Sequence, residues 1–312
     1  MIPILKSHKI QNDLSNKVQN VNLEEIYSDM VSLDDNGNVQ NSHAKSVIDW
    51  LGNKIVINKK IYTFKDIVFA DFNTLIKIKE YLNSKPSIKK DKSYKSDIEA
   101  LYSSRLDRVK FINTLEITVC PYCNRNFVNT LKERTMCQFD HFINKSEYPL
   151  FFVSFFNLVP VCASCNHIKR TNDFNYSPHD INFTANQLLT FSYELKGGNL
   201  TNTNDFEITI SDINPIISEN VDKLHLLELF QINKDVVSDL YRKSLLCNDS
   251  FIDMIYNIDD KLFSSRDELR QLIIGTYIEE NEYGKRPLAK LTNDIAKEFN
   301  LINTTNSSFL NC

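Results

Sequence analysis

The chain of 312 residues contains no run of about 18 apolar residues, so it lacks the sequence feature of a transmembrane helix. Its first residues are briefly apolar and then polar, without the long apolar core of a signal peptide. It also shows no internal repeat and no sustained coiled-coil pattern. These absences predict a cytoplasmic protein that does not contact a membrane.

A strong net charge is missing as well, since 36 basic and 40 acidic residues leave a formal charge of −4. Global charge therefore does not indicate nucleic-acid binding, but its local distribution is uneven. Residues 85–110 contain eight basic and four acidic side chains. For the 85–95 part, a solvated face and a phosphate-binding surface both remain open. For Lys169 and Arg170, which follow the second cysteine pair described next, we favour contact with phosphates of a nucleic acid.

What the chain does have is two Cys-x-x-Cys pairs. Cysteine occurs seven times, and four of the seven form these pairs: Cys120, Cys123, Cys162 and Cys165. In a reducing compartment such pairs are typical of metal ligands rather than disulfides. Four thiolates satisfy a closed tetrahedral structural zinc site, which we prefer to a redox role. We expect Cys137 and Cys247 to be small core residues and Cys312 to lie in a frayed terminus.

Polar residues suited to phosphodiester hydrolysis lie between and just after the cysteine pairs. Asp140 and His141 fall in a short β-prone run flanked by phenylalanines, and Asn157 precedes a second such run. Asn166 directly follows the last cysteine, where a helix is expected to begin. Two strands and a helix, held at their ends by zinc, would bring these four side chains together.

This order of residues resembles the HNH endonuclease family, whose catalytic core is a ββα-metal fold. The resemblance covers about residues 115 to 175 and runs from Cys-x-x-Cys through Asp-His and Asn-Leu-Val-Pro to Cys-x-x-Cys-Asn. The stretches Cys-Pro-Tyr-Cys-Asn-Arg-Asn-Phe and Asp-His-Phe-Ile-Asn-Lys-Ser-Glu-Tyr-Pro are similar to HNH proteins of bacterial anti-phage defence. That group includes proteins paired with an ATPase in Septu-like and retron-associated modules.

The resemblance implies a role for each residue. His141 would be the general base that activates water, which suits an imidazole at neutral pH. Asp140 and Asn166 would ligate a catalytic divalent ion, while Asn157 would fix the orientation of His141. Lys169 would neutralise phosphate charge. The implied partners are nucleic acid, with DNA favoured, and an ATPase-type protein of the same operon.

Two oxygen donors at positions 140 and 166 favour Mg²⁺ or Mn²⁺ over zinc in the catalytic position. The neighbouring His167 lies about 100° further around the expected helix, so we expect it to contact phosphate or to be a bystander. A small shift of the helix would make His167 the ligand instead of Asn166, and this alternative stays open.

The expected fold is α+β: a small ββα core with a four-cysteine zinc site, set between mainly helical regions and a β-hairpin. Three segments follow, namely a helical region at 1–115, the nuclease core at 116–180, and a hairpin with helices at 181–312. Apolar spacing predicts helices over 64–82, 96–114, 267–274 and 288–299. Alternation predicts hairpins over 54–62 and 189–210, and a charged loop over 83–94.

The sequence thus predicts a metal-dependent HNH endonuclease that leaves 5′-phosphate and 3′-hydroxyl ends. Two alternatives remain open. The same chemistry permits an effector that cleaves tRNA or other RNA, and the thiols alone permit a zinc-stapled adaptor that binds nucleic acid without cutting it.

Overall fold

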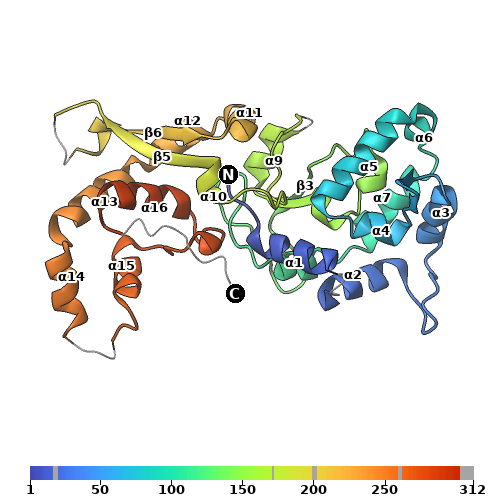
Figure 1. Ribbon diagram of the computed structural model, residues 1–312, viewed down its shortest axis with the longest axis horizontal. Coiled ribbons are helices and arrows are strands. Elements are labelled where there is room, and N and C mark those ends of the chain that lie inside the picture. The colour runs from blue at the N-terminus through green and yellow to red at the C-terminus, as the bar shows by residue number, and fades with distance from the viewer. Residues whose placement is uncertain (17–19, 171, 199–201, 259–261, 303–312) are drawn as a thin grey trace. The chain divides into compact units, whose positions relative to one another are not determined.

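The computed structural model describes residues 1–16, 20–170, 172–198, 202–258 and 262–302, and the fold is mixed α and β (Figure 1). The chain forms two compact units. The N-terminal unit contains Pro3–Tyr122 and Asn126–Phe183, and the C-terminal unit contains Met1–Ile2, Cys123–Arg125 and Thr184–Cys312. Segments 1–115 and 116–180 thus share most of one unit, and the three-part division of the sequence stays a prediction.

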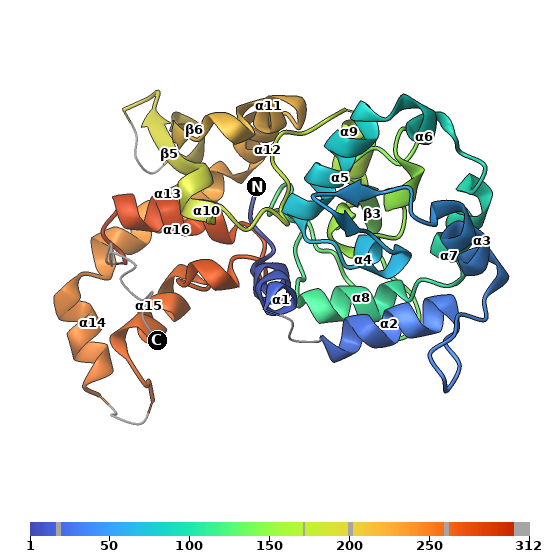
Figure 2. The same cartoon turned by 45° about the vertical axis from the view of Figure 1, so that its right-hand side comes forward.

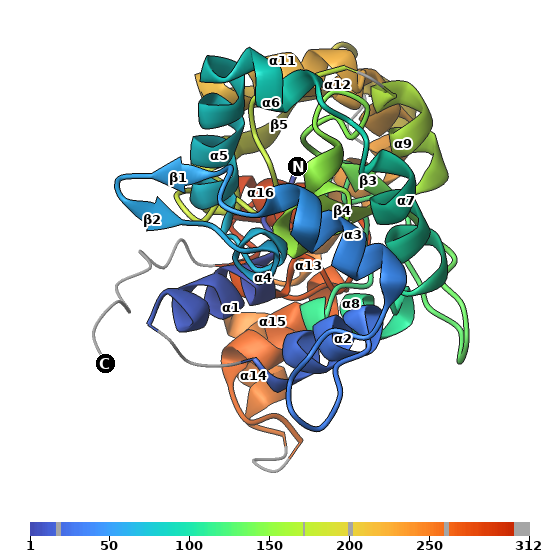
Figure 3. The ribbon, with the colours of Figure 1, turned by 90° about the vertical axis from the view of Figure 1, so that its right-hand side faces the viewer.

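The N-terminal unit combines nine α-helices among its described residues with two short hairpins (Figures 2 and 3). The helices are α1 (Leu5–Ser15), α2 (Val21–Val31), α3 (Ser42–Leu51), α4 (Phe64–Val68), α5 (Phe72–Ser84), α6 (Pro86–Lys90), α7 (Lys95–Ser104), α8 (Arg108–Leu115) and α9 (Ala163–Lys169). The strands are β1 (Val56–Ile57), β2 (Lys60–Ile61), β3 (Gln138–His141) and β4 (Leu158–Val161). The β1–β2 hairpin confirms the expected turn at Asn58 and Lys59.

Two of the expected helices are each divided in two. The 64–82 helix is interrupted before Asp71, whose carboxylate accepts a hydrogen bond from the backbone N–H of Thr74 and so begins α5. The 96–114 helix is interrupted before Asp107, which begins α8 in the same way by accepting from Lys110. An N-cap inside an apolar pattern starts a new helix without disturbing the spacing of the core residues. The expected loop at 83–94 also contains α6, with Pro86 at its first position.

The β3–β4 hairpin lies in an aromatic core. Phe155, from the connection between the two strands, contacts Phe69 edge-on with ring centroids 5.2 Å apart. On its other side it stacks on Phe111 of α8 at 5.6 Å. Figure 2 shows β3 surrounded by helices of its own unit. Because the ring of Phe155 is fully buried, this packing holds the hairpin connection in a fixed position.

The C-terminal unit is built on a second hairpin, β5 (Leu189–Leu195) with β6 (Phe206–Ile213), which confirms the expectation for 189–210. Its helices are α10 (Ala185–Leu188), α11 (Pro215–Lys223), α12 (Leu226–Phe230), α13 (Lys234–Leu246), α14 (Asp249–Tyr256), α15 (Arg266–Ile274) and α16 (Ala289–Glu298). The last two confirm the helices expected near 267–274 and 288–299.

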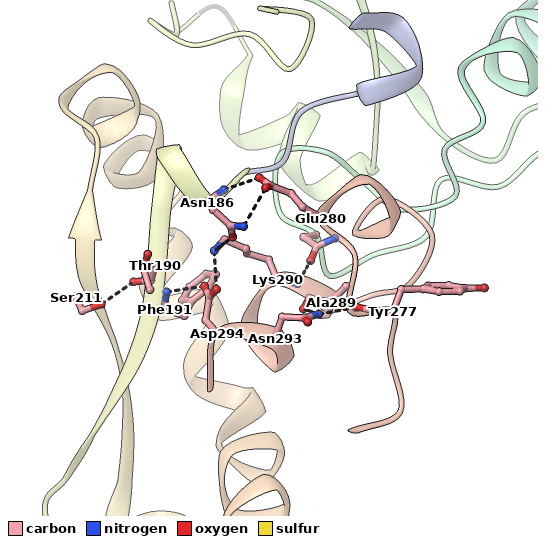
Figure 4. A network of polar contacts seen from close by, with 11 residues as sticks. Asn186, Thr190, Phe191, Ser211, Tyr277, Glu280, Ala289, Lys290, Asn293 and Asp294 are labelled. Atoms are coloured by element: carbon pink, nitrogen blue, oxygen red, sulfur yellow. Dashed lines mark hydrogen bonds and ion pairs between the residues drawn. The ribbon is translucent and has the colours of Figure 1, made fainter. Parts of the chain in front are cut away.

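A buried ion pair anchors α16 in this unit (Figure 4). The Lys290 ammonium donates to Asp294 at 2.6 Å and to the Asn186 side chain at 3.0 Å. The second carboxylate oxygen of Asp294 accepts from the backbone N–H of Phe191 in β5 at 2.9 Å. Asn186 in turn donates to Glu280. The pair therefore joins α16 to β5 and α10.

Two further expectations concern cysteines and membranes. Cys137 and Cys247 are half-buried rather than core residues, because each lies at the edge of an element; Cys312 lies outside the described residues. Across the described ranges, no helix has both the length and the apolar character needed to cross a membrane.

Candidate active site and metal centre

The four cysteines of the two pairs gather at one point. Their sulfur atoms all lie within 4.8 Å of one another, and all four side chains are buried. The backbone N–H of Cys120 donates to the carbonyl of Asn126 at 2.8 Å, which closes the turn around the first pair. The second pair lies where β4 passes into α9. Four buried thiols this close together fit the ligand set of a structural zinc ion.

The strands and helix expected between the cysteines are present. β3 and β4 pair antiparallel, with Asp140 opposite Val159 and His141 opposite Leu158. α9 packs on β3. Asn157 immediately precedes β4, and Asn166 lies in α9. This ββα arrangement brings residues that are up to 35 positions apart in the sequence, from Gln138 to Asp173, to the cavity described below.

The Asp140 carboxylate is buried and bound on both oxygens. The hydroxyl of Tyr122 donates to one oxygen at 2.5 Å, and the Lys169 ammonium pairs with the carboxylate at 3.0 Å. Burial, aided by the Asp140 charge, raises the pKa of Tyr122 well above its usual value, so its hydroxyl stays protonated. Lys169 is only 2% exposed. The structure therefore places this lysine against Asp140 in the wall of the cavity described below, and its contact with phosphate stays a prediction.

His141 is held in one tautomer. A carbonyl oxygen only accepts hydrogen bonds, so Nε2 carries the ring hydrogen and donates it to the carbonyl of Phe152 at 3.0 Å. In the neutral ring Nδ1 is then unprotonated. Burial is the main reason that the pKa of His141 falls to about 3, and the positive charges of Lys145, Lys169 and Arg108 lower it further. The imidazole is therefore neutral at physiological pH, as a proton acceptor must be, but its pKa lies well below the value near 6.5 that the sequence led us to expect for a general base.

Asn157 fixes the loop that follows β3. Its side-chain oxygen accepts from the backbone N–H of Ile143 at 2.7 Å, and its amide donates to the carbonyls of Ile143 and Phe151 at 3.3 and 3.0 Å. Phe151 is the neighbour of Phe152, which holds His141. The asparagine therefore binds the backbone next to the hydrogen-bond partner of His141, and none of these three hydrogen bonds is to His141 itself.

Asn166 and His167 both lie on the open side of α9. The Asn166 amide nitrogen donates to the side chain of Gln138 at 2.6 Å, which leaves the amide oxygen for another partner. His167 is exposed, and its Nε2 accepts from the Arg170 guanidinium at 2.9 Å.

Asp140, His141, Asn166 and His167 line one cavity of about 510 Å³. Its walls come from β3, the loop after β3, and α9 together with the segment that follows α9. Asn157 lies behind the wall rather than in it. The lining residues with polar or charged side chains are Gln138, Asp140, His141, Asn144, Lys145, Ser146, Asn166, His167, Lys169, Arg170, Asn172 and Asp173.

Three neighbours of the site were not identified from sequence. Tyr122, the partner of Asp140, lies between the first two cysteines, and Lys145 lies four residues after His141. Both residues therefore lie within the motif region and could have been named from the sequence. Tyr102, whose ring centroid lies 5.0 Å from that of His141, belongs to α7 and carries no sequence signal.

Comparison with known proteins gives a partial relationship. No protein-family model matches the chain, and no solved structure matches it. The chain is similar to the Septu protein PtuB of Bacillus thuringiensis, with 32% identity over 84 residues. The matched segment is 26% of this chain and 32% of PtuB. The chain thus spans about a third of the length of the curated relative it matches, and it is similar to a Septu protein over that part.

Proposed function

We propose that the chain is a metal-dependent endonuclease of the HNH type that hydrolyses phosphodiester bonds of nucleic acid, DNA above all. The observation that carries this proposal is the ββα arrangement, in which Asp140, His141 and Asn166 line one cavity beside four buried cysteines. The similarity to PtuB supports a role in bacterial anti-phage defence. An ATPase-type protein of the same operon is the expected partner.

His141 is the proposed general base. Its Nδ1 is unprotonated, the ring lines the cavity, and the bond from Nε2 to Phe152 fixes the ring's orientation. Nδ1 accepts a proton from the attacking water, and the bond to the Phe152 carbonyl favours the resulting imidazolium against the opposing effects of burial and the nearby positive charges. Lys145, which also lines the cavity, faces the developing negative charge of the phosphate.

The residues present fit a hard divalent ion. The Asp140 carboxylate and the Asn166 amide oxygen line the same cavity and are the oxygen donors that Mg²⁺ and Mn²⁺ prefer. When bound, such an ion supplies Lewis-acid stabilisation of the phosphate and of the leaving oxygen. Lys169 pairs with the carboxylate of Asp140 at 3.0 Å, beside the position proposed for the ion. His167 remains the alternative to Asn166 as the second ligand.

The four cysteines and Asn157 have supporting roles in this proposal. Cys162 and Cys165 lie at the end of β4 and in α9, so a zinc ion held there would fix the helix that carries Asn166. Asn157 fixes the loop that leads to the histidine's partner. Neither group touches the reacting atoms.

The test is cleavage of supercoiled plasmid and of total tRNA by the purified chain, with Mg²⁺ or Mn²⁺ and with or without the operon's ATPase. We expect metal-dependent nicking of plasmid. The nicks should be resealed by DNA ligase, which requires 5′-phosphate and 3′-hydroxyl ends. Cleavage of tRNA with intact plasmid would replace DNA by RNA as the substrate. Binding without cutting under every condition would leave the zinc adaptor as the function.

Two single variants decide between the candidate metal ligands. If Asn166 binds the ion, Asn166→Ala raises the Mn²⁺ concentration needed for half-maximal cleavage, whereas His167→Ala leaves it unchanged. The reverse result assigns the ligand to His167. Both side chains lie on the open side of α9, so neither substitution removes a core contact.

A further inference from the structure

A second and larger hollow lies in the N-terminal unit. It measures about 990 Å³ and is formed by the end of α7, the turn into α8, one side of α8 and the 132–135 loop. We call it the basic groove. Its lining residues are Asn22, Ser103, Ser104, Arg105, Leu106, Asp107, Arg108, Val109, Lys110, Asn113, Thr114, Lys132, Glu133, Arg134 and Thr135.

The basic groove carries an excess of uncompensated positive charge. Five of its lining side chains are basic and two are acidic. Of the acidic ones, Asp107 is already used as the N-cap of α8. Lys110 pairs with Glu25 outside the groove. The other basic side chains form no ion pair with a carboxylate anywhere in the described ranges: Arg105, Arg108, Lys132 and Arg134.

The groove adjoins the candidate active site through Tyr102. The Arg108 guanidinium lies 4.6 Å from the centre of the Tyr102 ring, and that ring centroid lies 5.0 Å from the His141 ring. On the active-site side, the Lys145 ammonium lies 5.9 Å from the same tyrosine ring. Lys145 of the active-site cavity and Arg108 of the basic groove therefore both lie within about 6 Å of the same tyrosine ring.

We propose that the basic groove binds the phosphate backbone of the nucleic acid on one side of the bond that is cut. Arginine and lysine side chains recognise phosphates through charge-assisted hydrogen bonds, and the serine, asparagine and threonine side chains of the groove add neutral donors. This inference rests on the proposed nuclease function and states where the substrate runs. Since backbone contacts carry no base information, binding in the groove is independent of sequence.

The test removes three exposed charges of the groove together, by Arg105→Gln, Lys132→Gln and Arg134→Gln. The matched control removes three exposed lysines outside the groove, by Lys9→Gln, Lys59→Gln and Lys77→Gln. Both sets are made in the His141→Ala protein so that bound substrate stays intact. Fluorescence anisotropy with a labelled DNA duplex and a labelled RNA hairpin of matched sequence gives Kd between about 50 and 200 mM salt.

We expect the groove variant to bind about tenfold more weakly or worse at low salt, and the control variant to bind like the parent. For the duplex, the slope of log Kd against log salt should fall by about 2 to 3, because each lost phosphate contact removes about 0.9. Equal urea unfolding midpoints of the two variants will show that both are folded. Indistinguishable Kd values and salt slopes of the two variants, on both nucleic acids, would overturn the inference.

The two proposals can fail separately. If the groove variant binds more weakly but the protein that retains His141 does not cut, the groove is a nucleic-acid binding site and the proposed nuclease function is wrong. Metal-dependent cutting, together with equal binding by the groove and control variants, keeps the nuclease and rejects the groove. A loss of RNA binding alone keeps the groove and assigns it an RNA backbone.

Discussion

The side chain of Asn157 satisfies three backbone groups that are remote from water. It is fully buried and bonds to both polar groups of Ile143 and to the carbonyl of Phe151. Serine or alanine cannot span these groups, whereas the planar amide offers an acceptor and two donors. The residue-scale consequence is a loop whose shape depends on one amide.

We expect Asn157→Ala to lower the free energy of unfolding by about 3 kcal/mol, because it leaves buried backbone groups without partners. Equilibrium urea unfolding measures the change. The matched control is Asn144→Ala, since within the described residues the Asn144 side chain accepts one exposed bond, from the backbone N–H of Ser146, and its loss should cost less than about 1 kcal/mol. A loss no greater than that of the control would contradict the role given to Asn157.

Buried neutral histidines make the fold sensitive to acid. Burial lowers the pKa of His141 to about 3, and burial also lowers the pKa of His179 to about 4. His179 accepts from Ser7 at Nδ1 and donates from Nε2 to the carbonyl of Leu158 at the start of β4. Both pKa values lie below the usual histidine value of about 6.5, so the unfolded chain binds more protons.

The free energy of unfolding therefore falls as the pH falls. The stabilisation is complete above about pH 6.5 and is lost as the pH falls towards about 4, at up to about 1.4 kcal/mol per pH unit for each histidine. We expect His141→Ala to show a shallower decline of stability between pH 6.5 and 5 than the parent, measured by urea unfolding. Because both proteins keep the same cysteines and His179, only the share of His141 differs. Equal slopes would contradict a neutral buried His141.

Among the elements, the ends of β4 and α9 depend on the four cysteines. If these bind zinc, the purified chain contains about one zinc ion, and Cys162→Ser loses it and unfolds at lower urea. Metal analysis by atomic emission measures the content. Cys247→Ser, which changes a half-buried thiol outside the cluster, should keep the ion. Equal zinc in both variants would contradict the site.

The ion pair of α16 offers a second test at the scale of elements. Lys290 and Asp294 are 1% and 3% exposed, so removing one partner leaves the other charge buried. We expect Lys290→Met to cost about 3 to 5 kcal/mol in the free energy of unfolding. Adding Asp294→Asn to it should restore part of the loss, because the amide oxygen still accepts from Phe191 but carries no charge. A double variant no more stable than the single one would contradict this explanation.

The elements also show what the sequence could predict. Alternating residues predicted the β1–β2 and β5–β6 hairpins, and the Asp-His and Asn-Leu-Val-Pro runs predicted β3 and β4. Helical spacing could not show that Asp71 and Asp107 start new helices, because apolar residues keep their period across each break. Arg108 and Tyr102 reach His141 only through tertiary packing, which no local pattern contains.

At the scale of the whole molecule, the net charge of −4 conceals a local excess of positive charge. The candidate active site and the basic groove both belong to the N-terminal unit. The residues that line the two cavities all lie between positions 22 and 173. Electrostatic attraction of a polyanion depends on such local distribution and not on the sum. A chain of negative net charge can therefore still attract a polyanion to its basic groove.

The central claim is that His141 and its neighbours hydrolyse phosphodiester bonds with a divalent ion. The most direct measurement is the initial rate of plasmid nicking with Mn²⁺ by the parent, by His141→Ala, and by His225→Asn, which changes an exposed histidine of the C-terminal unit. We predict that His141→Ala cuts about 10² to 10⁴ times more slowly, that His225→Asn cuts at the parental rate, and that all three hold equal zinc. Nicking at the parental rate by His141→Ala, or nicking that persists without added divalent ion, would contradict the proposed function.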